Sequence, residues 1–218
     1  MEIAGTGDPV RRTRVKFCGL TRPGDVRLAS EMGVDALGFV IARGSPRSLS
    51  PTQLPGLRAA VSPLVEVVAL FMNPRGSEVL DALRRLRPTL LQFHGGESDA
   101  FCRSFGLPFV KTLPMGVGSE DPLAAARRYP SATAFLLDGH GPGQAGGRGQ
   151  SFDWSQTPQL ARPIFLAGGL HAGNVGAAIR ASRSFAVDVS SGIESAPGLK
   201  DGERMQKFLE EVRRADLE

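Results

Sequence analysis

Two groups of small polar residues follow apolar segments near the end of the chain. Ser190-Ser191-Gly192 comes directly after residues 185–189, and Gly168-Gly169 ends the apolar run 164–167. Glycine-rich turns bring backbone N–H groups close to a bound anion, and serine adds short hydroxyl donors, so this spacing predicts a phosphate site at the ends of two neighbouring strands. Ordinary strand-terminating turns contain the same residues, and the motif alone leaves both interpretations open.

A thiol and a carboxylate end two other apolar segments. Cys18 closes residues 15–18, and Asp138 closes residues 134–138. A thiolate can act as a general base, and a carboxyl group whose pKa is raised by apolar surroundings can act as a general acid. A lone cysteine is more often a small buried hydrophobe, and Asp138 could instead cap the loop that follows it.

Further polar side chains follow other apolar segments: Arg47, Gln92, His94 and Asp188, with Asn73 and Lys111 at equivalent places. Each has a simpler interpretation, because Arg47 could be solvated, Asp188 could be a structural hydrogen-bond acceptor, and His94 is more often a loop hydrogen-bonder than a base. Taken with the thiol and the carboxyl group, the set is typical of proton transfer on an anionic substrate. It predicts neither a metal site nor a cofactor.

Alternating apolar and amphipathic segments position these residues, and eight strand–helix units predict a single-domain (β/α)8 TIM barrel of the α/β class. The carboxyl ends of barrel strands converge on one face, so the residues above should share one site. An open doubly wound sheet is the alternative, and the missing G-x-G-x-x-G after the first strand disfavours it.

Strands are expected at residues 15–19, 35–41, 65–71, 89–93, 108–112, 134–138, 164–169 and 185–189. Helices are expected at residues 21–32, 77–86, 97–105, 121–129 and 200–214, with Thr21 as the N-cap of the first. Two further helices are expected to begin at Ser50-Pro51 and near His171.

Composition bounds the class of protein. The chain has 218 residues, 41% of them hydrophobic, with a net charge of +4. Its size suits one catalytic domain over residues 14–218, preceded by a loose extension over residues 1–13. Scattered arginines and few aromatic residues argue against nucleic acid, and the mild positive charge suits a small phosphorylated substrate. Two distant cysteines, Cys18 and Cys102, predict no disulfide framework, and neither a signal peptide nor a membrane segment is visible, so we expect a cytoplasmic protein.

From Val15 onward the chain resembles the phosphoribosylanthranilate isomerase family of tryptophan biosynthesis. Many ordered matches carry the resemblance, and their combination is specific where each alone is weak. The matching stretches are Lys16-Phe17-Cys18-Gly19-Leu20-Thr21, Asp35-Ala36-Leu37-Gly38-Phe39-Val40, Ser45-Pro46-Arg47, Leu91-Gln92-Phe93-His94-Gly95, Leu136-Leu137-Asp138, Phe152-Asp153-Trp154, Leu166-Ala167-Gly168-Gly169-Leu170 and Val187-Asp188-Val189-Ser190-Ser191-Gly192.

The resemblance implies an Amadori rearrangement of N-(5-phosphoribosyl)anthranilate to 1-(2-carboxyphenylamino)-1-deoxyribulose 5-phosphate. It implies that Cys18 is the general base, Asp138 the general acid, and Arg47 the contact for the anthranilate portion. It requires no cofactor and is compatible with a monomer or a homodimer. The further substrate-binding residues expected are Gln92, His94 and Asp188, with Gly168, Gly169, Ser190, Ser191 and Gly192 around the phosphate.

The chain departs from the family pattern at two places. Gln150 stands where lysine is usual, with Arg148 nearby, and His171-Ala172-Gly173-Asn174 replaces the more usual Asn-Pro-Glu-Asn.

Two alternatives to the isomerase assignment remain, one another enzyme and one a binding protein. The histidine-pathway phosphoribosyl isomerase uses an aspartate at the end of strand one, where this chain has Cys18, and a non-catalytic phosphate-ligand barrel has no need to pair a thiol with Asp138.

Overall fold

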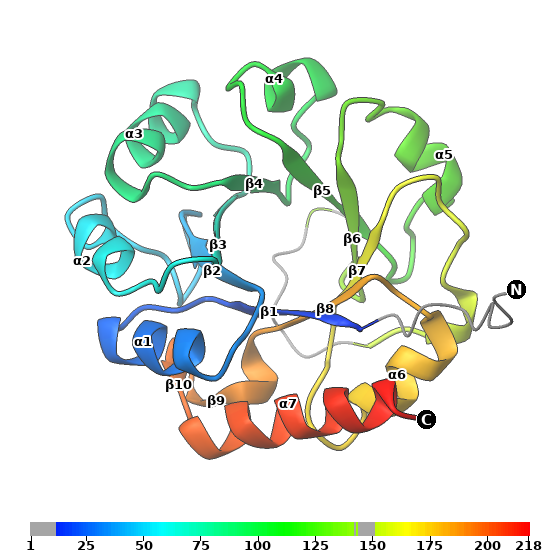
Figure 1. Ribbon diagram of the computed structural model, residues 1–218. Helices are drawn as coiled ribbons and strands as arrows, with labels where there is room; N and C mark the ends of the chain where they lie inside the picture. Colours follow the sequence, from blue (N-terminus) through cyan, green and yellow to red (C-terminus); the bar gives the residue numbers. More distant parts are fainter. Residues whose placement is uncertain (1–11, 142, 144–150) are drawn as a thin grey trace, which may run out of the picture.

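Eight parallel strands form a closed barrel with helices around it (Figure 1). The computed structural model describes residues 12–141, 143 and 151–218. Strand β1 pairs with both β2 and β8, which closes the barrel and confirms the predicted fold. The barrel strands are β1 (Arg14–Cys18), β2 (Ala36–Val40), β3 (Glu66–Phe71), β4 (Leu90–Phe93), β5 (Phe109–Pro114), β6 (Ala134–Asp138), β7 (Ile164–Leu166) and β8 (Ala186–Val189).

The two faces of each strand pack against different surroundings, because successive side chains alternate across a sheet. In β1, Val15 and Phe17 belong to the main apolar core between the barrel and its helices. Lys16 and Cys18 point the other way, into the barrel, where Cys18 packs with Val40. The barrel interior therefore carries charged and reactive groups, and the helices bury the outer face.

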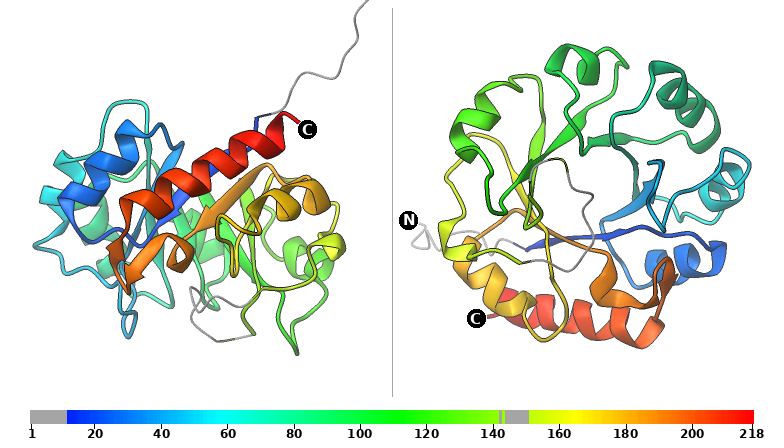
Figure 2. Two further views of the ribbon diagram at one scale, coloured as in Figure 1. Left: turned by 90° about the horizontal axis from the view of Figure 1, so that it is seen from below. Right: turned by 180° about the vertical axis from the view of Figure 1, so that it is seen from behind.

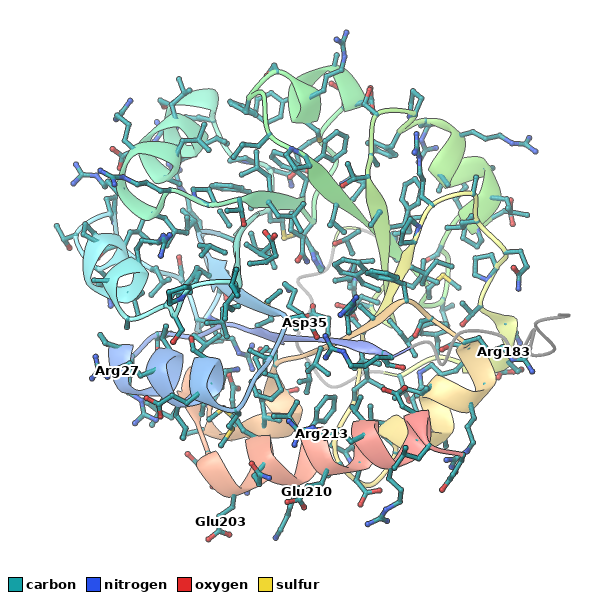
Figure 3. The ribbon with its side chains drawn as sticks, in the orientation of Figure 1. Arg27, Asp35, Arg183, Glu203, Glu210 and Arg213 are labelled. Carbon is teal, nitrogen blue, oxygen red and sulfur yellow. The ribbon has the colours of Figure 1, made fainter. Side chains whose placement is uncertain are left out.

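The helices cover the barrel with their apolar faces and expose charged faces. Figure 2 shows this ring of helices from two further sides. In Figure 3, Arg27 of α1 and both Glu203 and Glu210 of α7 project away from the barrel. The helices are α1 (Pro23–Glu31), α2 (Leu54–Ala59), α3 (Gly76–Leu86), α4 (Asp99–Arg103), α5 (Pro122–Arg127), α6 (Val175–Ser182) and α7 (Gly202–Asp216).

Several predicted helix starts are wrong. The α2 helix begins at Leu54 rather than at Ser50-Pro51, and α6 begins at Val175 rather than near His171. Thr21 does not cap α1, because its hydroxyl donates to the Gly198 carbonyl at 2.5 Å. Among the described residues the sixth unit also lacks an α-helix, and a 3-10 helix, η1 (Trp154–Gln156), stands between β6 and β7.

A hairpin between β8 and α7 was not predicted. It comprises β9 (Glu194–Ala196) and β10 (Leu199–Lys200), after the 3-10 helix η2 (Ser191–Ile193). Figure 1 shows it between α1 and α7. The predicted closing helix at 200–214 therefore starts two residues late in the structure, at Gly202, where the Asp201 carboxylate accepts from the Arg204 N–H at 3.0 Å.

The end of the predicted N-terminal extension is attached to the barrel. Thr13 is buried, and its N–H and hydroxyl donate to the Asp216 carboxylate at 2.9 and 2.6 Å. Arg12 donates to Asp35 through Nη1 at 3.2 Å. The rest of the predicted extension, residues 1–11, lies outside the described residues.

Candidate functional site

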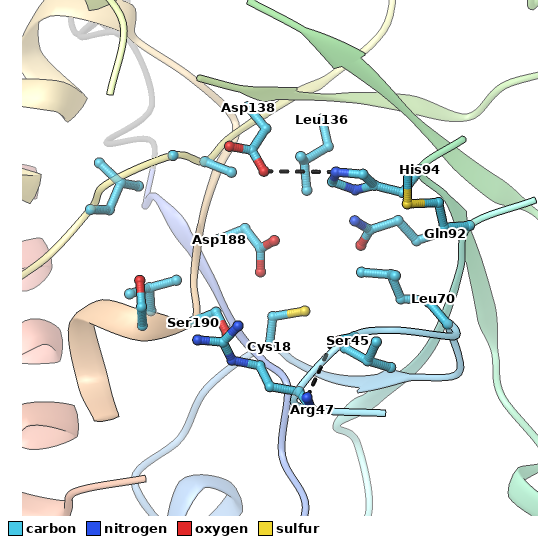
Figure 4. Close-up of a pocket in the computed structure, with 18 of the residues that line it drawn as sticks. Cys18, Ser45, Arg47, Leu70, Gln92, His94, Leu136, Asp138, Asp188 and Ser190 are labelled. Carbon is cyan, nitrogen blue, oxygen red and sulfur yellow. Dashed lines mark hydrogen bonds and ion pairs between the residues drawn. The ribbon is translucent and has the colours of Figure 1, made fainter. Parts of the chain in front are cut away.

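The carboxyl ends of the barrel strands surround one pocket (Figure 4), with an empty volume of about 740 Å³ including space open to solvent. Every residue predicted as catalytic or substrate-binding except Gly192 lines it. Figure 4 shows the Cys18 thiol and the Asp138 carboxylate entering the pocket from opposite sides, with the Asp188 carboxylate between them. The lining residues from the prediction are Cys18, Arg47, Gln92, His94, Asp138, Gly168, Gly169, Asp188, Ser190 and Ser191.

A buried lysine supplies the positive charge next to Cys18. Lys16, two residues earlier in β1, faces the same side of the strand, and its Nζ lies 2.8 Å from Asp188 Oδ1. Burial raises the pKa of the Cys18 thiol, and the charges of Lys16 and Lys200 oppose this rise. Lys16 was not among the predicted site residues, although its two-residue spacing from Cys18 could have identified it.

Glycine at position 38 leaves room for the thiol. A Cβ on Gly38, in the adjacent β2, would lie 2.7 Å from Cys18 Sγ and 3.1 Å from Lys16 Nζ. A side chain there would displace the thiol, because real Cβ atoms essentially never come within 3.0 Å of another atom, and it would crowd the Lys16 ammonium group. The absence of a side chain at Gly38 thus leaves room for both the Cys18 thiol and the Lys16 ammonium group.

The Asp138 carboxyl group is held in its protonated form at higher pH than usual. Burial, with the negative charge of Asp188, raises its pKa to about 6, although His140 and the N–H groups of His140 and Gly139 favour ionisation. The Nε2 atoms of His94 and His140 each lie 3.9 Å from Asp138 Oδ2. A carboxyl group with these properties suits proton donation near neutral pH.

The two histidines beside Asp138 stack on each other, with ring centroids 4.6 Å apart. Burial, followed by the charges of His140 and the nearby lysines, lowers the pKa of His94 to about 3, so this imidazole is neutral. His140 was not predicted as a site residue. It follows Asp138 by two residues in a loop, where no strand periodicity indicates its direction.

Arg47 lines the pocket, and its guanidinium group is bound to the carboxylate of Glu194. Its Nε and Nη2 donate to the two oxygens of Glu194 at 2.8 and 2.7 Å. Glu194 Oε1 also accepts from Lys200 Nζ at 2.7 Å. Burial opposes ionisation of Glu194, but the hydrogen bonds and charges of Arg47 and Lys200 together outweigh burial, and the pKa of Glu194 is lowered. Neither Glu194 nor Lys200 was predicted.

The predicted phosphate residues lie on two loops in contact. Gly168 and Gly169 have φ of 85° and 64°, a conformation that favours glycine, and Asn174 Nδ2 donates to the Gly169 carbonyl at 2.9 Å. Gly192 does not line the pocket, and a Cβ on it would lie 1.9 Å from the Leu170 carbonyl oxygen. Gly192 therefore allows the loop after β8 to touch the loop after β7.

Five other residues that the sequence singled out have different outcomes. Gln92 lies in the pocket wall, and its Oε1 has no hydrogen-bond partner within the described part of the chain. Lys111 and Asn73 line a neighbouring cavity instead, and Lys111 pairs with Glu97 at 3.0 Å. Gln150, which departs from the family pattern in the long loop, and its neighbour Arg148 lie outside the described residues.

Comparison with known proteins identifies one family. The family model described as N-(5'phosphoribosyl)anthranilate (PRA) isomerase matches residues 15–211. An N-(5'-phosphoribosyl)anthranilate isomerase from Xanthomonas oryzae pv. oryzae (strain PXO99A) is 57% identical over 211 residues, covering 94% of this chain and 95% of the relative.

Solved structures agree. Phosphoribosyl anthranilate isomerase from Thermotoga maritima superposes with a TM-score of 0.83 at 35% identity, over 93% of this chain and 99% of that one. A phosphoribosyl anthranilate isomerase in complex with reduced 1-(o-carboxyphenylamino)-1-deoxyribulose 5-phosphate superposes with a TM-score of 0.78 at 32% identity, with the same coverage of both chains.

Proposed function

Because the chain belongs to the phosphoribosylanthranilate isomerase family and is an isomerase of tryptophan biosynthesis, we propose that Asp138 and Cys18 are its general acid and general base. The observation that carries this proposal is the placement of the two groups on opposite sides of one pocket. The reaction is the Amadori rearrangement of N-(5-phosphoribosyl)anthranilate, which moves a proton from the sugar C2 and opens the furanose ring.

Asp138 would perform the first step. Its proton passes to the furanose ring oxygen, the C1–O bond breaks, and the anthranilate nitrogen lone pair forms the C1–N double bond of an iminium. The raised pKa of Asp138, about 6, supports this role because a general acid must hold its proton near the working pH. The neutral His94 beside it adds no competing positive charge.

Cys18 would perform the second step as a thiolate. It removes the proton from C2, and the C2–H electrons form the C1–C2 double bond while the iminium nitrogen is neutralised. The resulting enolamine tautomerises to the C2 ketone with protonation at C1. Lys16 supports the role of Cys18 because its charge favours the thiolate, which burial alone disfavours.

Binding groups at the two ends of the pocket would hold the substrate so that C2 lies near Cys18. Arg47 would bind the anthranilate carboxylate, and Glu194 holds the guanidinium in the pocket wall through two hydrogen bonds. Gly168, Gly169, Ser190 and Ser191, with Gly192 behind them, would hold the phosphate. Gln92, His94 and Asp188 would contact the sugar. Such remote contacts supply binding energy that orients the reacting carbons.

Turnover of freshly generated N-(5-phosphoribosyl)anthranilate by wild type, Cys18→Ala and Asp138→Asn tests the proposal. Each variant should lose activity by roughly 100- to 10,000-fold, the usual contribution of a general acid or base. Circular dichroism must show that both variants fold. An unimpaired, folded Cys18→Ala variant would discard Cys18 as the base, and an unimpaired Asp138→Asn variant would discard Asp138 as the acid.

We also propose that the chain works in the cytoplasm, as one catalytic domain over residues 14–218, as a monomer or a homodimer. No helix among the described residues is long and apolar enough to cross a membrane. Light scattering coupled to gel filtration measures the molar mass, and a trimer or larger assembly would contradict the proposal.

A further inference from the structure

Three buried imidazole nitrogens beside Asp138 have no hydrogen-bond partner within the described residues. They are both ring nitrogens of His94 and Nε2 of His140. Leaving a buried polar group without a partner costs free energy, so native proteins keep such groups for a water, an ion or a chemical task. The proposed function places His94 near the sugar, but it assigns no proton transfer to any of these three nitrogens.

The geometry brings three ligand atoms together. Each Nε2 lies 3.9 Å from the same carboxylate oxygen, Asp138 Oδ2. One ligand atom from each of the three residues lies within 4.8 Å of the other two. The three residues come from the end of β4 and from the end of β6 with the loop after it, so the barrel itself holds them in place.

The hydrogen bonding of the two imidazoles suits metal binding. Neither ring nitrogen of His94 has a hydrogen-bond partner within the described residues, so no such bond competes with an ion. His140 Nδ1 lies 2.8 Å from the Gly141 carbonyl oxygen, an acceptor, so the proton belongs on Nδ1 and the lone pair of Nε2 faces Asp138. A hydrogen bond from the second ring nitrogen to a backbone carbonyl is the usual way in which proteins orient a metal-binding histidine.

Nearby charge does not exclude a cation. Two lysines, Lys111 and Lys16, have charges that act on His94. Lys111 is paired with Glu97 at 3.0 Å, and Lys16 is paired with Asp188 at 2.8 Å. Both positive charges are therefore compensated by a buried carboxylate, and the Asp138 carboxylate has no lysine of its own among these pairs.

We propose that His94, Asp138 and His140 form an inhibitory site for a divalent transition-metal ion of the Zn²⁺ type. Two imidazoles and one carboxylate are a common ligand set for Zn²⁺, and two of the three ligands, His94 and Asp138, line the substrate pocket. Ligand bonds of about 2.0–2.2 Å require the three atoms to approach more closely than they do here, which turns the stacked rings toward Asp138. Mg²⁺ and Ca²⁺ prefer oxygen ligands and should not bind.

Inhibition follows from the identity of the carboxylate, and this part rests on the proposed function. A carboxylate that coordinates a metal ion cannot carry the proton that Asp138 must deliver to the furanose ring oxygen. The bound ion also occupies the space in which His94 and Asp138 meet the substrate. Binding of the ion therefore removes the general acid without altering Cys18.

Calorimetric titration of the full chain with Zn²⁺, in the absence of substrate, tests the site independently of activity. We expect one ion per chain, with affinity reduced at least about tenfold, equivalent to about 1.4 kcal/mol, in His140→Gln and in His94→Gln. Cys18→Ala should retain the affinity, which excludes the thiol as the ligand. The exposed third histidine, His171, provides the matched control, and His171→Gln should bind Zn²⁺ as wild type does.

Activity measurements then test inhibition. Stoichiometric Zn²⁺ should abolish turnover of the wild type, EDTA should restore it, and Mg²⁺ should have no effect. Absent or Cys18-dependent Zn²⁺ binding, or equal binding by His140→Gln and wild type, would overturn the site. Binding without loss of turnover would overturn the inhibition alone. A chain that binds Zn²⁺ through the two histidines but never isomerises the substrate would contradict the proposed function and leave the metal site standing.

Discussion

The reactivity of a single thiol depends on one buried ammonium group. Lys16 is almost fully buried, and its charge favours the Cys18 thiolate, whereas burial and the Asp188 carboxylate disfavour it. We therefore predict that Lys16→Met raises the pKa of Cys18 further, so that the thiolate fraction at any given pH falls. Asp188→Asn should shift the pKa in the opposite direction, because it removes a negative charge that faces the thiol.

The rate of Cys18 alkylation by iodoacetamide as a function of pH measures this shift. The second cysteine, Cys102, is buried in the main core and its pKa is raised to about 12, so a Cys102→Ala background leaves one thiol to follow. The midpoint of the rate profile should move up in Lys16→Met and down in Asp188→Asn. Equal midpoints in both variants would show that Lys16 does not support the thiolate.

A second residue-scale prediction concerns Gly38. Gly38→Ala should lower turnover by about tenfold or more and destabilise the fold by about 1–3 kcal/mol, because the added Cβ meets Cys18 Sγ at 2.7 Å and the Cys18 Cα at 3.1 Å. Gly56, inside α2, has open space at the Cβ position. Gly56→Ala should keep full turnover and gain up to about 1 kcal/mol of stability. Steady-state kinetics and urea unfolding compare the pair, and an active Gly38→Ala would remove the steric argument.

The residues that follow strand periodicity could be predicted from the sequence. Cys18 and Asp138 end apolar segments and Asp188 lies next to the end of one, and parallel strands bring such positions to one face of a barrel. His140 was missed because it lies in a loop. Lys16 was not predicted either, because it stands inside an apolar strand, and only its two-residue spacing from Cys18 indicates that both side chains face the barrel interior.

At the scale of elements, the β9–β10 hairpin joins separate parts of the site. Lys200 Nζ donates to the carbonyls of Cys18 at 2.6 Å and Ser190 at 3.1 Å, and it pairs with Glu194, which holds Arg47. One buried ammonium group thus contacts the end of β1, the end of β8 and the support of Arg47. We infer that the hairpin sets the relative positions of the base, the phosphate loop and the arginine.

Lys200→Met should therefore lower kcat and raise KM together, with kcat/KM reduced by about 100-fold or more, since a small displacement of a catalytic group is costly. Steady-state kinetics measure both constants, and iodoacetamide labelling reports whether the Cys18 pKa also rises. Lys207, exposed on α7, gives the matched control, and Lys207→Met should behave as wild type. A folded Lys200→Met variant with normal kcat and KM would show that the hairpin only fills space.

The hairpin also shows what local sequence patterns could not predict. Its strands have three and two residues, too short for a periodic pattern, and Lys200 was assigned to the closing helix. Its partners Cys18 and Ser190 are 182 and 10 residues away in the chain. The barrel strands were predictable because each is a local apolar run, whereas a bond between β10 and β1 exists only once the barrel has closed.

At the scale of the whole molecule, the barrel carries a charged pair inside its sheet, where apolar side chains would pack well. Lys16 and Asp188 lie on adjacent strands that close the barrel, and their side chains are 2% and 9% exposed. Taking two charges out of water costs several kcal/mol per ion, and their attraction only partly offsets this cost. We therefore infer that the Lys16–Asp188 pair, which joins β1 to β8, contributes more to the reaction than to the stability of the fold.

The double variant Lys16→Met/Asp188→Leu tests this trade-off between stability and function. We expect Lys16→Met alone to lose about 3–5 kcal/mol of unfolding free energy, because it leaves Asp188 buried without its partner. The double variant should recover that loss and reach or exceed wild-type stability, since apolar side chains of similar volume often replace buried ion pairs without cost. Its turnover should stay far below that of wild type, because the thiolate has lost its cation. Urea unfolding and steady-state kinetics measure the two quantities, and a double variant less stable than Lys16→Met would mean that the ion pair holds the barrel closed.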